Sequence, residues 1–256
     1  MKNWLFALSL ALMGAVPATA GVDSLSAKLE SRRIGTIEPG TYQAGDNVVF
    51  SLARWNDKYL LRLNGDPEIY VLYPASTTMG GRILKYDTSA TAISVSGWGG
   101  MTIYTDAKPD GLPAVRADDH DPMVPAPQPV KFQELRNAAS DESAHLSYVR
   151  NINVAFVADW DRLSQRPGSW AQAFEAMENA GRGIEQFTAE PRNRERLIRH
   201  MKAVRFQDGM RPAIAISGKT LLVTFDASKA YAGRPSSRAI EHALGHMLGQ
   251  KRPQPF

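Results

Sequence analysis

The chain of 256 residues contains no cysteine and carries a formal net charge of +4. The lack of cysteine excludes disulfides, a cysteine nucleophile and thiolate metal sites, and the small charge gives no reason to expect a nucleic-acid partner. The charge is uneven, because residues 132–256 carry 18 Lys and Arg against 13 Asp and Glu. We therefore expect any anionic partner to meet the C-terminal half.

Residues 1–20 have the pattern of a secretory signal peptide. Lys2 gives a positive start, an apolar run follows, and small residues lead to a cleavage site after Ala20. The apolar run is shorter than the roughly 20 residues that span a membrane as a helix, and no later segment reaches that length. The sequence therefore predicts a periplasmic or secreted protein without a transmembrane segment in the mature chain.

The stretch from 46 to 106 contains the densest run of strand-like segments. Val48, Phe50 and Leu52, for example, occupy every second position, as on a strand with one buried face. Six such segments follow one another at residues 48–52, 58–63, 68–73, 82–86, 91–95 and 101–105. Their hairpin-length connections favour antiparallel pairing over βαβ units. We expect a small antiparallel β-meander, a curled sheet or half-barrel, in a domain of residues 21–116.

Trp98 lies between glycines in the stretch 97–100 of this domain. An exposed indole at this turn could stack on a sugar or a peptide. An indole that folds back over the sheet is the commoner arrangement, and we expect it here.

Residues 117–131 form a predicted acidic linker, in which four prolines favour an extended chain. The acidic cluster at residues 118–121 could hold a hard cation. Its spacing lacks the alternation and the glycine of a calcium loop, so a solvated linker is the preferred interpretation.

In residues 132–256, apolar residues recur every three or four positions, which predicts a helical region. Apolar residues from Leu146 to Leu163 indicate a first helix, Ser169 is the expected N-cap of a second, and residues 192–204 indicate a third. Residues 205–207, 213–217 and 220–225 are predicted strands, and the last two form a β-hairpin through a two-residue turn. A terminal helix follows. The fold class is therefore α+β.

Two sets of side chains in this region are candidate sites. Arg192, Arg196 and Arg199 share one helix face and could bind an anionic partner, although a solvated face is the commoner outcome. His242 and His246 lie one helical turn apart and resemble the zinc-binding pair of a protease helix. The position of that motif's general base holds Ala243, so the pair predicts at most a metal site and no peptidase.

Four short segments carry a resemblance to a known family. They are residues 67–72 (PEIYVL), 99–106 (GGMTIYTD), 111–114 (GLPA) and 233–237 (GRPSS). They resemble a family of secreted proteins of Gram-negative bacteria that is catalogued only as a domain of unknown function. The resemblance covers about a third of the chain. The resemblance implies export and supports the predicted extent of the domains. It implies no activity and no catalytic residue.

Two functions from different classes remain. The preferred one is a non-catalytic periplasmic or secreted envelope protein that binds or scaffolds an unidentified envelope component or anionic ligand, with no cofactor. The alternative is a metal-dependent or hydrolytic enzyme with a divergent site around His242 and His246.

Overall fold

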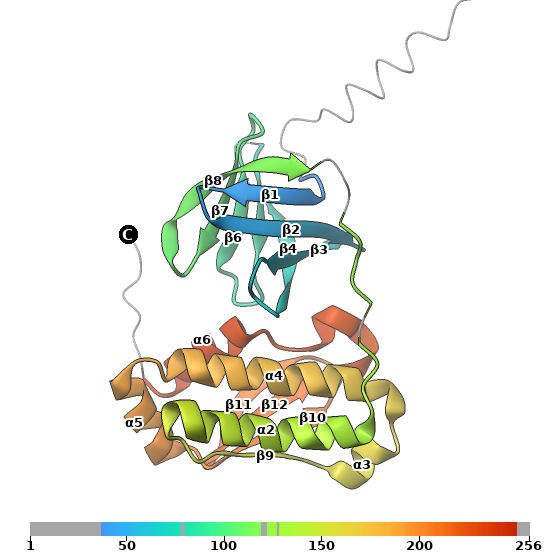
Figure 1. The fold of residues 1–256 in the computed structure, drawn as a ribbon, viewed down its shortest axis with the longest axis vertical. Coiled ribbons are helices and arrows are strands. Elements are labelled where there is room, and N and C mark those ends of the chain that lie inside the picture. The colour runs from blue at the N-terminus through green and yellow to red at the C-terminus, as the bar shows by residue number, and fades with distance from the viewer. Residues whose placement is uncertain (1–36, 78–79, 119–121, 127, 250–256) are drawn as a thin grey trace, which may run out of the picture.

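The computed structural model describes residues 37–77, 80–118, 122–126 and 128–249. These residues form a β-barrel followed by a layered α/β domain, which lie one above the other in Figure 1. The predicted signal peptide and three of the four residues of the acidic cluster, 119–121, lie outside the described residues.

Eight antiparallel strands close into a barrel in which each strand pairs with the next along the chain. They are β1 (Gly40–Ala44), β2 (Val48–Trp55), β3 (Lys58–Leu63), β4 (Ile69–Ser76), β5 (Arg82–Lys85), β6 (Thr91–Val95), β7 (Met101–Thr105) and β8 (Lys108–Asp118). The last strand returns to the first, and Ala44 pairs with Ala114. The predicted antiparallel meander is confirmed, and its six strands correspond to β2–β7.

The expected curled sheet or half-barrel is closed, because β1 and β8 pair with each other. The sequence did not indicate β8, since Pro109, Gly111 and Pro113 argue against a strand. The structure accommodates them through a register shift against β7 and a backbone φ of 88° at Gly111. The pairing of β8 with β1, at the other end of the domain, determines that residues 108–118 form a strand. The local sequence does not indicate this strand.

Side chains fill the interior of the barrel, as expected for eight strands. The fully buried ones include Phe50, Leu52, Leu61, Leu72, Leu84, Ile93 and Ile103. Phe50 and Leu52 lie two positions apart on β2, which is the period that predicted the sheet. Burial of each such side chain stabilises the fold by about 1.5–3 kcal/mol.

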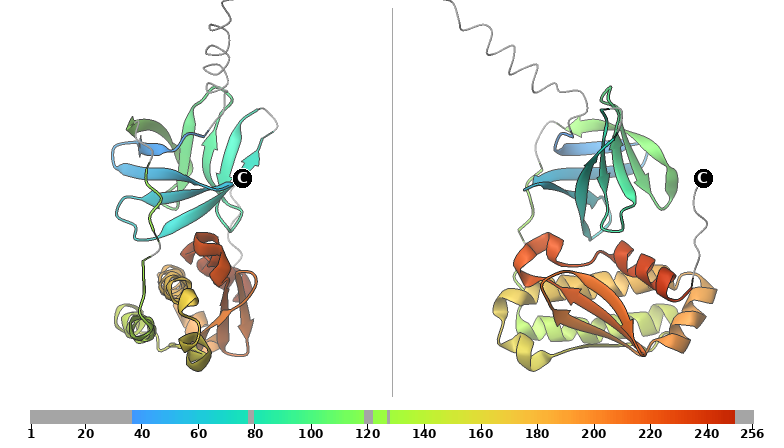
Figure 2. Two further views of the ribbon diagram at one scale, coloured as in Figure 1. Left: turned by 90° about the vertical axis from the view of Figure 1, so that its right-hand side faces the viewer. Right: turned by 180° about the vertical axis from the view of Figure 1, so that it is seen from behind.

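The C-terminal domain places helices on a four-stranded sheet of order β11-β12-β10-β9. Its elements are α2 (Phe132–Arg150), β9 (Ala155–Ala158), α3 (Trp160–Ser164), η1 (Pro167–Ser169), α4 (Trp170–Phe187), α5 (Pro191–His200), β10 (Ala203–Asp208), β11 (Ala213–Ser217), β12 (Thr220–Phe225), η2 (Ala227–Gly233) and α6 (Ser237–Met247). Figure 2 shows α2 and α4 against one face of the sheet. α4 contacts β10 and β12, α2 contacts β9, and α6 packs on α4.

The predicted first helix through Leu163 is wrong. α2 ends at Arg150, its C-cap Asn151 has a left-handed φ of 54°, and the chain continues into β9. Ile152, Val154 and Phe156 are buried at alternate positions, and β9 pairs in parallel with β10. Their spacing suits a helix and a strand equally, and only pairing with a strand about 50 residues later decides between them.

The later elements follow the sequence more closely. α4 and α6 occur where the second and terminal helices were predicted, and β11 and β12 form the predicted hairpin. Ser169 precedes α4, but its hydroxyl donates to the Arg166 carbonyl at 2.8 Å and does not cap the helix. Within the described residues, no helix has the length and the apolar content needed to cross a membrane.

Trp98 does not fold back over the sheet. Its side chain is 96% exposed at the tip of the β6–β7 hairpin. The predicted linker shows no helix or strand in its described residues after Asp118, and Val124 packs with the buried Tyr231 of η2.

Candidate functional site

The barrel and the C-terminal domain meet where the chain enters α6. Ser236 is the N-cap of this helix, and its hydroxyl accepts a 3.0 Å hydrogen bond from the backbone nitrogen of Ala239. The Ser236 hydroxyl donates to Asp87 Oδ1 at 2.6 Å, and its backbone nitrogen donates to Asp87 Oδ2 at 2.8 Å. Asp87 lies in the turn between β5 and β6. A barrel carboxylate therefore binds the positive end of a helix dipole in the other domain.

Glu68, which immediately precedes β4, is the second barrel carboxylate at this helix end. It is only 2% exposed. Its Oε1 accepts a 2.9 Å hydrogen bond from the backbone nitrogen of Ser237, and its Oε2 lies 3.8 Å from Arg182 Nε of α4. Burial raises the pKa of Glu68, while the bonds from Ser237 and the positive charges of Arg182 and Arg234 oppose that rise. This carboxylate is sealed inside the contact between the domains.

Two arginines complete the contact. The guanidinium of Arg238 donates two hydrogen bonds to Asp106, at 2.8 and 2.7 Å, and lies 4.2 Å from the centre of the Tyr86 ring. Arg234 is buried, forms an ion pair with Glu175 of α4, and donates a 3.4 Å hydrogen bond to the Ile69 carbonyl of β4 in the barrel. Bidentate arginine–carboxylate pairs are among the stronger and more directional polar contacts. Together with the two helix-capping carboxylates, they fix the barrel on α4 and α6.

Three of the segments that carry the family resemblance supply this contact. Glu68 belongs to residues 67–72, Asp106 to residues 99–106 and Ser236 to residues 233–237. The structure therefore brings together residues that are up to 169 positions apart in the chain.

A cleft of about 830 Å³ opens beside the contact. This volume lies within the usual range for small-ligand sites, about 300–1,000 Å³. Its barrel side is lined by Trp55, Asn56, Lys58, Tyr73, Lys85, Tyr86, Asp87 and Ser89, and its other side by Arg211, Pro212, Ser228, Lys229, Ala230 and Ala232. We refer to it as the interdomain cleft.

The interdomain cleft is positively charged. Four of its lining side chains are cations, namely Lys58, Lys85, Arg211 and Lys229. Lys58 pairs with the exposed Asp57 at 2.6 Å and Lys229 with Asp226 at 3.3 Å. Neither Lys85 nor Arg211 forms an ion pair with any residue that the structure describes. Asp87, the single carboxylate in the lining, already accepts two hydrogen bonds from Ser236.

Aromatic side chains supply the apolar part of the cleft. Trp55 packs edge-on against Tyr231, with ring centres 5.7 Å apart, and Lys58 lies 5.7 Å from the centre of the Tyr73 ring. Burial raises the pKa of Tyr73, and that of Tyr86 to about 12, so both phenols stay neutral at physiological pH. The cleft thus combines neutral aromatic surface with cationic groups.

The backbone around the cleft is unusual. Three lining residues that are not glycine have positive φ, Asn56 at 54°, Ser89 at 66° and Ala230 at 39°. Asn56 and Ser89 lie in tight hairpin turns, where this conformation is expected. Ala230, with ψ of −125°, lies inside η2 and is the least common of the three. A conformation like that of Ala230 costs about 1–3 kcal/mol, and such residues cluster at ligand sites.

The histidine pair predicted from the sequence lies elsewhere. His242 and His246 are both exposed on α6, on the side away from the buried Ile240 and Leu244. No cluster of three or more His, Cys, Asp or Glu suited to a metal occurs in the described residues. The metal hypothesis for this pair stays a prediction to be tested.

The predicted arginine face also lies apart from the cleft. Arg192 and Arg199 are exposed on α5 and Arg196 is half-buried, and none of the three lines the cleft. The sequence does not indicate the cleft because its lining comes from five separate segments, near residues 55–58, 73, 85–89, 211–212 and 228–232. No local spacing links these segments.

A family model described as Domain of unknown function (DUF4908) matches residues 23–244. This match spans most of the chain and both domains, so the resemblance extends well beyond the third of the chain that the quoted segments covered. No curated protein and no solved structure matches the chain.

Proposed function

We propose that this chain, which belongs to the family described as Domain of unknown function (DUF4908), is a non-catalytic binding protein that holds a small anionic ligand in the interdomain cleft. The proposal rests on the four cations of that cleft, Lys58, Lys85, Arg211 and Lys229. Two of them have no carboxylate partner among the described residues, and the lining carboxylate Asp87 is already engaged by Ser236. An anion would compensate this charge.

The proposed ligand also has a flat apolar group. Trp55 and Tyr73 line the same cleft as the cations, and aromatic faces bind flat apolar groups. Free inorganic anions would leave this surface in contact with water. An aromatic or amphiphilic carboxylate, sulfonate or phosphate satisfies both parts of the lining.

We place this binding function in the bacterial envelope. The support is the leader-like pattern of residues 1–20, which predicts export to the periplasm or secretion. Fusion of these residues to a reporter that is active only outside the cytoplasm should give activity. A fusion that remains full-length and inactive inside the cell would refute this part of the proposal.

A fluorescence titration tests the cleft. The probe is 8-anilinonaphthalene-1-sulfonate, which carries one sulfonate on fused aromatic rings, and the uncharged comparison is N-phenyl-1-naphthylamine. We expect saturable binding of the sulfonate near one equivalent. Lys85→Glu/Arg211→Glu should weaken it at least tenfold, about 1.4 kcal/mol, while binding of the uncharged dye changes little.

The matched control is Arg62→Glu/Arg82→Glu. Both arginines are exposed on the barrel outside the cleft, and this double variant makes the same change in net charge. It should leave the affinity for the sulfonate within about twofold of the wild type, since exposed charges at a distance are screened by salt. Equal losses in both double variants would contradict the assignment of the cleft.

A further inference from the structure

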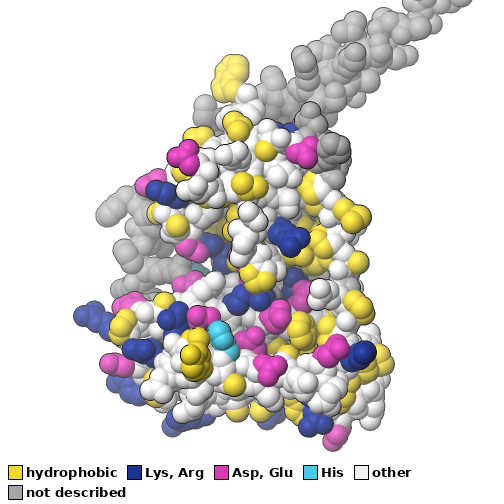
Figure 3. Space-filling view, in the orientation of Figure 1, with side chains coloured by type: hydrophobic (Ala, Val, Ile, Leu, Met, Phe, Trp, Pro, Cys, Tyr) yellow, Lys and Arg dark blue, Asp and Glu magenta, His cyan; other side chains and the backbone are white. Residues whose placement is uncertain are grey.

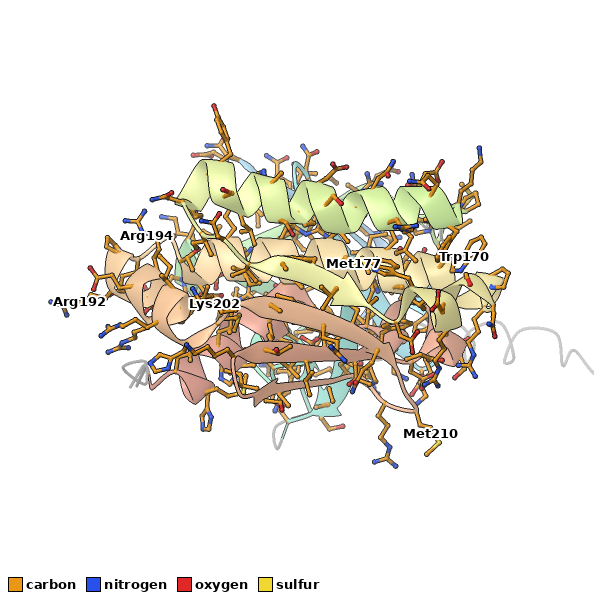
Figure 4. All side chains as sticks on the ribbon, turned by 90° about the horizontal axis from the view of Figure 1, so that it is seen from below. Trp170, Met177, Arg192, Arg194, Lys202 and Met210 are labelled. Atoms are coloured by element: carbon orange, nitrogen blue, oxygen red, sulfur yellow. The ribbon has the colours of Figure 1, made fainter. Side chains whose placement is uncertain are left out.

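A second cationic surface lies at one end of the C-terminal domain. We call it the basic end, and it consists of Arg192, Arg194, Arg196, Arg199, Lys202 and Lys219. Figure 3 shows Lys and Arg side chains gathered at the left of the lower domain, over α5. In Figure 4, Arg192, Arg194 and Lys202 lie at this end, and Trp170 and Met210 lie at the opposite end.

The fold joins two chain segments to make this surface. α5 supplies the four arginines, and the turn between β11 and β12 supplies Lys219. The Lys219 carbonyl accepts a 2.8 Å hydrogen bond from the backbone nitrogen of Lys202 and a 3.3 Å bond from that of Ala203. The turn is therefore held against the segment that leaves α5. Lys219 could not have been assigned to the arginine face from the sequence.

Among the described residues, the basic end has more cationic than acidic side chains. None of the six cations forms an ion pair with a residue in the described part of the chain, and the side chains of α5 and its N-cap include only two carboxylates, Glu190 and Glu195. At the domain contact, by comparison, Arg234 and Arg238 are paired with carboxylates. Concentrated like charge destabilises a fold by self-repulsion unless a counter-charge is present.

An apolar side chain lies among these cations. Ile198 is 40% exposed and lies on α5, one helical turn after Arg194. An exposed apolar group within a basic helical face is the pattern of surfaces that bind at the boundary between lipid headgroups and acyl chains. A nucleic-acid backbone would give Ile198 no comparable apolar environment.

We propose that the basic end docks the protein onto an anionic lipid surface. The guanidinium groups of α5 bind lipid phosphates bidentately, and Ile198 enters the headgroup boundary. This inference is independent of the proposed ligand site, because none of the six cations lines the interdomain cleft. It also extends the predicted role of Arg192, Arg196 and Arg199 to a specific class of partner.

Co-sedimentation with lipid vesicles tests the proposal. We expect the full chain to bind vesicles of equal parts phosphatidylglycerol and phosphatidylcholine at least tenfold more tightly than vesicles of phosphatidylcholine alone. Raising the salt concentration from about 0.05 M to 0.5 M should release it, because salt screens the attraction. Arg192→Glu/Arg196→Glu/Arg199→Glu should lower binding at least tenfold, and Ile198→Ala should lower it without removing the salt dependence.

Two controls separate docking from other effects. Arg62→Glu/Arg82→Glu should change vesicle binding less than twofold. The triple variant should retain the wild-type near-ultraviolet circular dichroism, which shows that it is folded; if it does not fold, the triple Arg→Gln variant replaces it. Equal binding to both vesicle types, or full binding by the triple variant, would overturn the proposal. So would tighter binding to single-stranded DNA or polyphosphate than to the anionic vesicles.

Discussion

The carboxylate of Glu68 accepts a 2.9 Å hydrogen bond from the backbone nitrogen of Ser237, which belongs to the other domain. Both residues are buried, so neither group can exchange this bond for one with water. The barrel thereby supplies the acceptor for one of the first, otherwise unpaired N–H groups of α6. The two domains therefore depend on each other to pair this buried donor and acceptor.

Glu68→Ala should destabilise the protein by about 2–3 kcal/mol, because it leaves the buried Ser237 N–H without an acceptor and removes one of the two ion pairs of Arg182. Glu68→Gln keeps an acceptor oxygen and should lose less. Urea unfolding of the two variants measures the difference. A Glu68→Ala protein as stable as the wild type would show that the contact contributes nothing.

Two glycines of α4 should respond oppositely to alanine. A Cβ at Gly183 would lie 2.5 Å from the Ser237 carbonyl oxygen and 2.6 Å from Ile240 Cβ, so Gly183→Ala forces α4 and α6 apart. We expect a loss of about 1–3 kcal/mol. At Gly181 the nearest atom is the end of the flexible Glu142 side chain, and the gain of up to about 1 kcal/mol in helix propensity offsets its displacement. Thermal unfolding of both variants tests this contrast.

Glu142 should make stability depend on pH. Burial raises the pKa of its carboxyl from 4.5 to about 7, with His145 opposing that rise and Glu178 adding to it. The folded state therefore holds the proton more tightly than the unfolded chain. The resulting stabilisation is complete below about pH 4.5 and is lost as the pH rises through 7. Because the group is partly exposed, we expect Glu142→Gln to exceed the wild type by only about 1 kcal/mol near pH 8 and to match it near pH 4. Urea unfolding at both pH values gives the result, and an unchanged difference between them would argue against the shift.

The histidine pair predicts weak metal binding. Two imidazoles are fewer than the three protein ligands of a catalytic zinc site or the four of a structural one. We expect no submicromolar zinc affinity by calorimetry, and a stability change within about 0.5 kcal/mol for His242→Ala/His246→Ala, because both side chains are exposed. Tight zinc binding that is lost in His246→Ala would instead favour the alternative enzyme function.

The sequence pattern was sufficient to predict strands that pair with their neighbours along the chain. Strands β2–β7 and the hairpin of β11 and β12 join neighbours along the chain, and period two with turn residues predicts them. Pairing between distant segments was not predictable. β8 contains Pro109 and Pro113, and β9 has the spacing of a helix, so both depend on partners that the sequence does not point to.

The two candidate surfaces also differ in how far the sequence predicts them. The arginine face of α5 follows from helical spacing, and the structure adds Lys219 through a turn 20 residues later. The interdomain cleft has no sequence signal, because Lys85 and Arg211 approach it from different domains. Only the contact between the domains brings these cations to one place.

A crystal structure of the complex with 8-anilinonaphthalene-1-sulfonate would test the central claim most directly. We expect the sulfonate within about 4 Å of Lys85 or Arg211, as in an ion pair, with the fused rings against Trp55 or Tyr73. Dye bound inside the barrel, on the open surface, or in the cleft with its sulfonate turned away from both cations would contradict it.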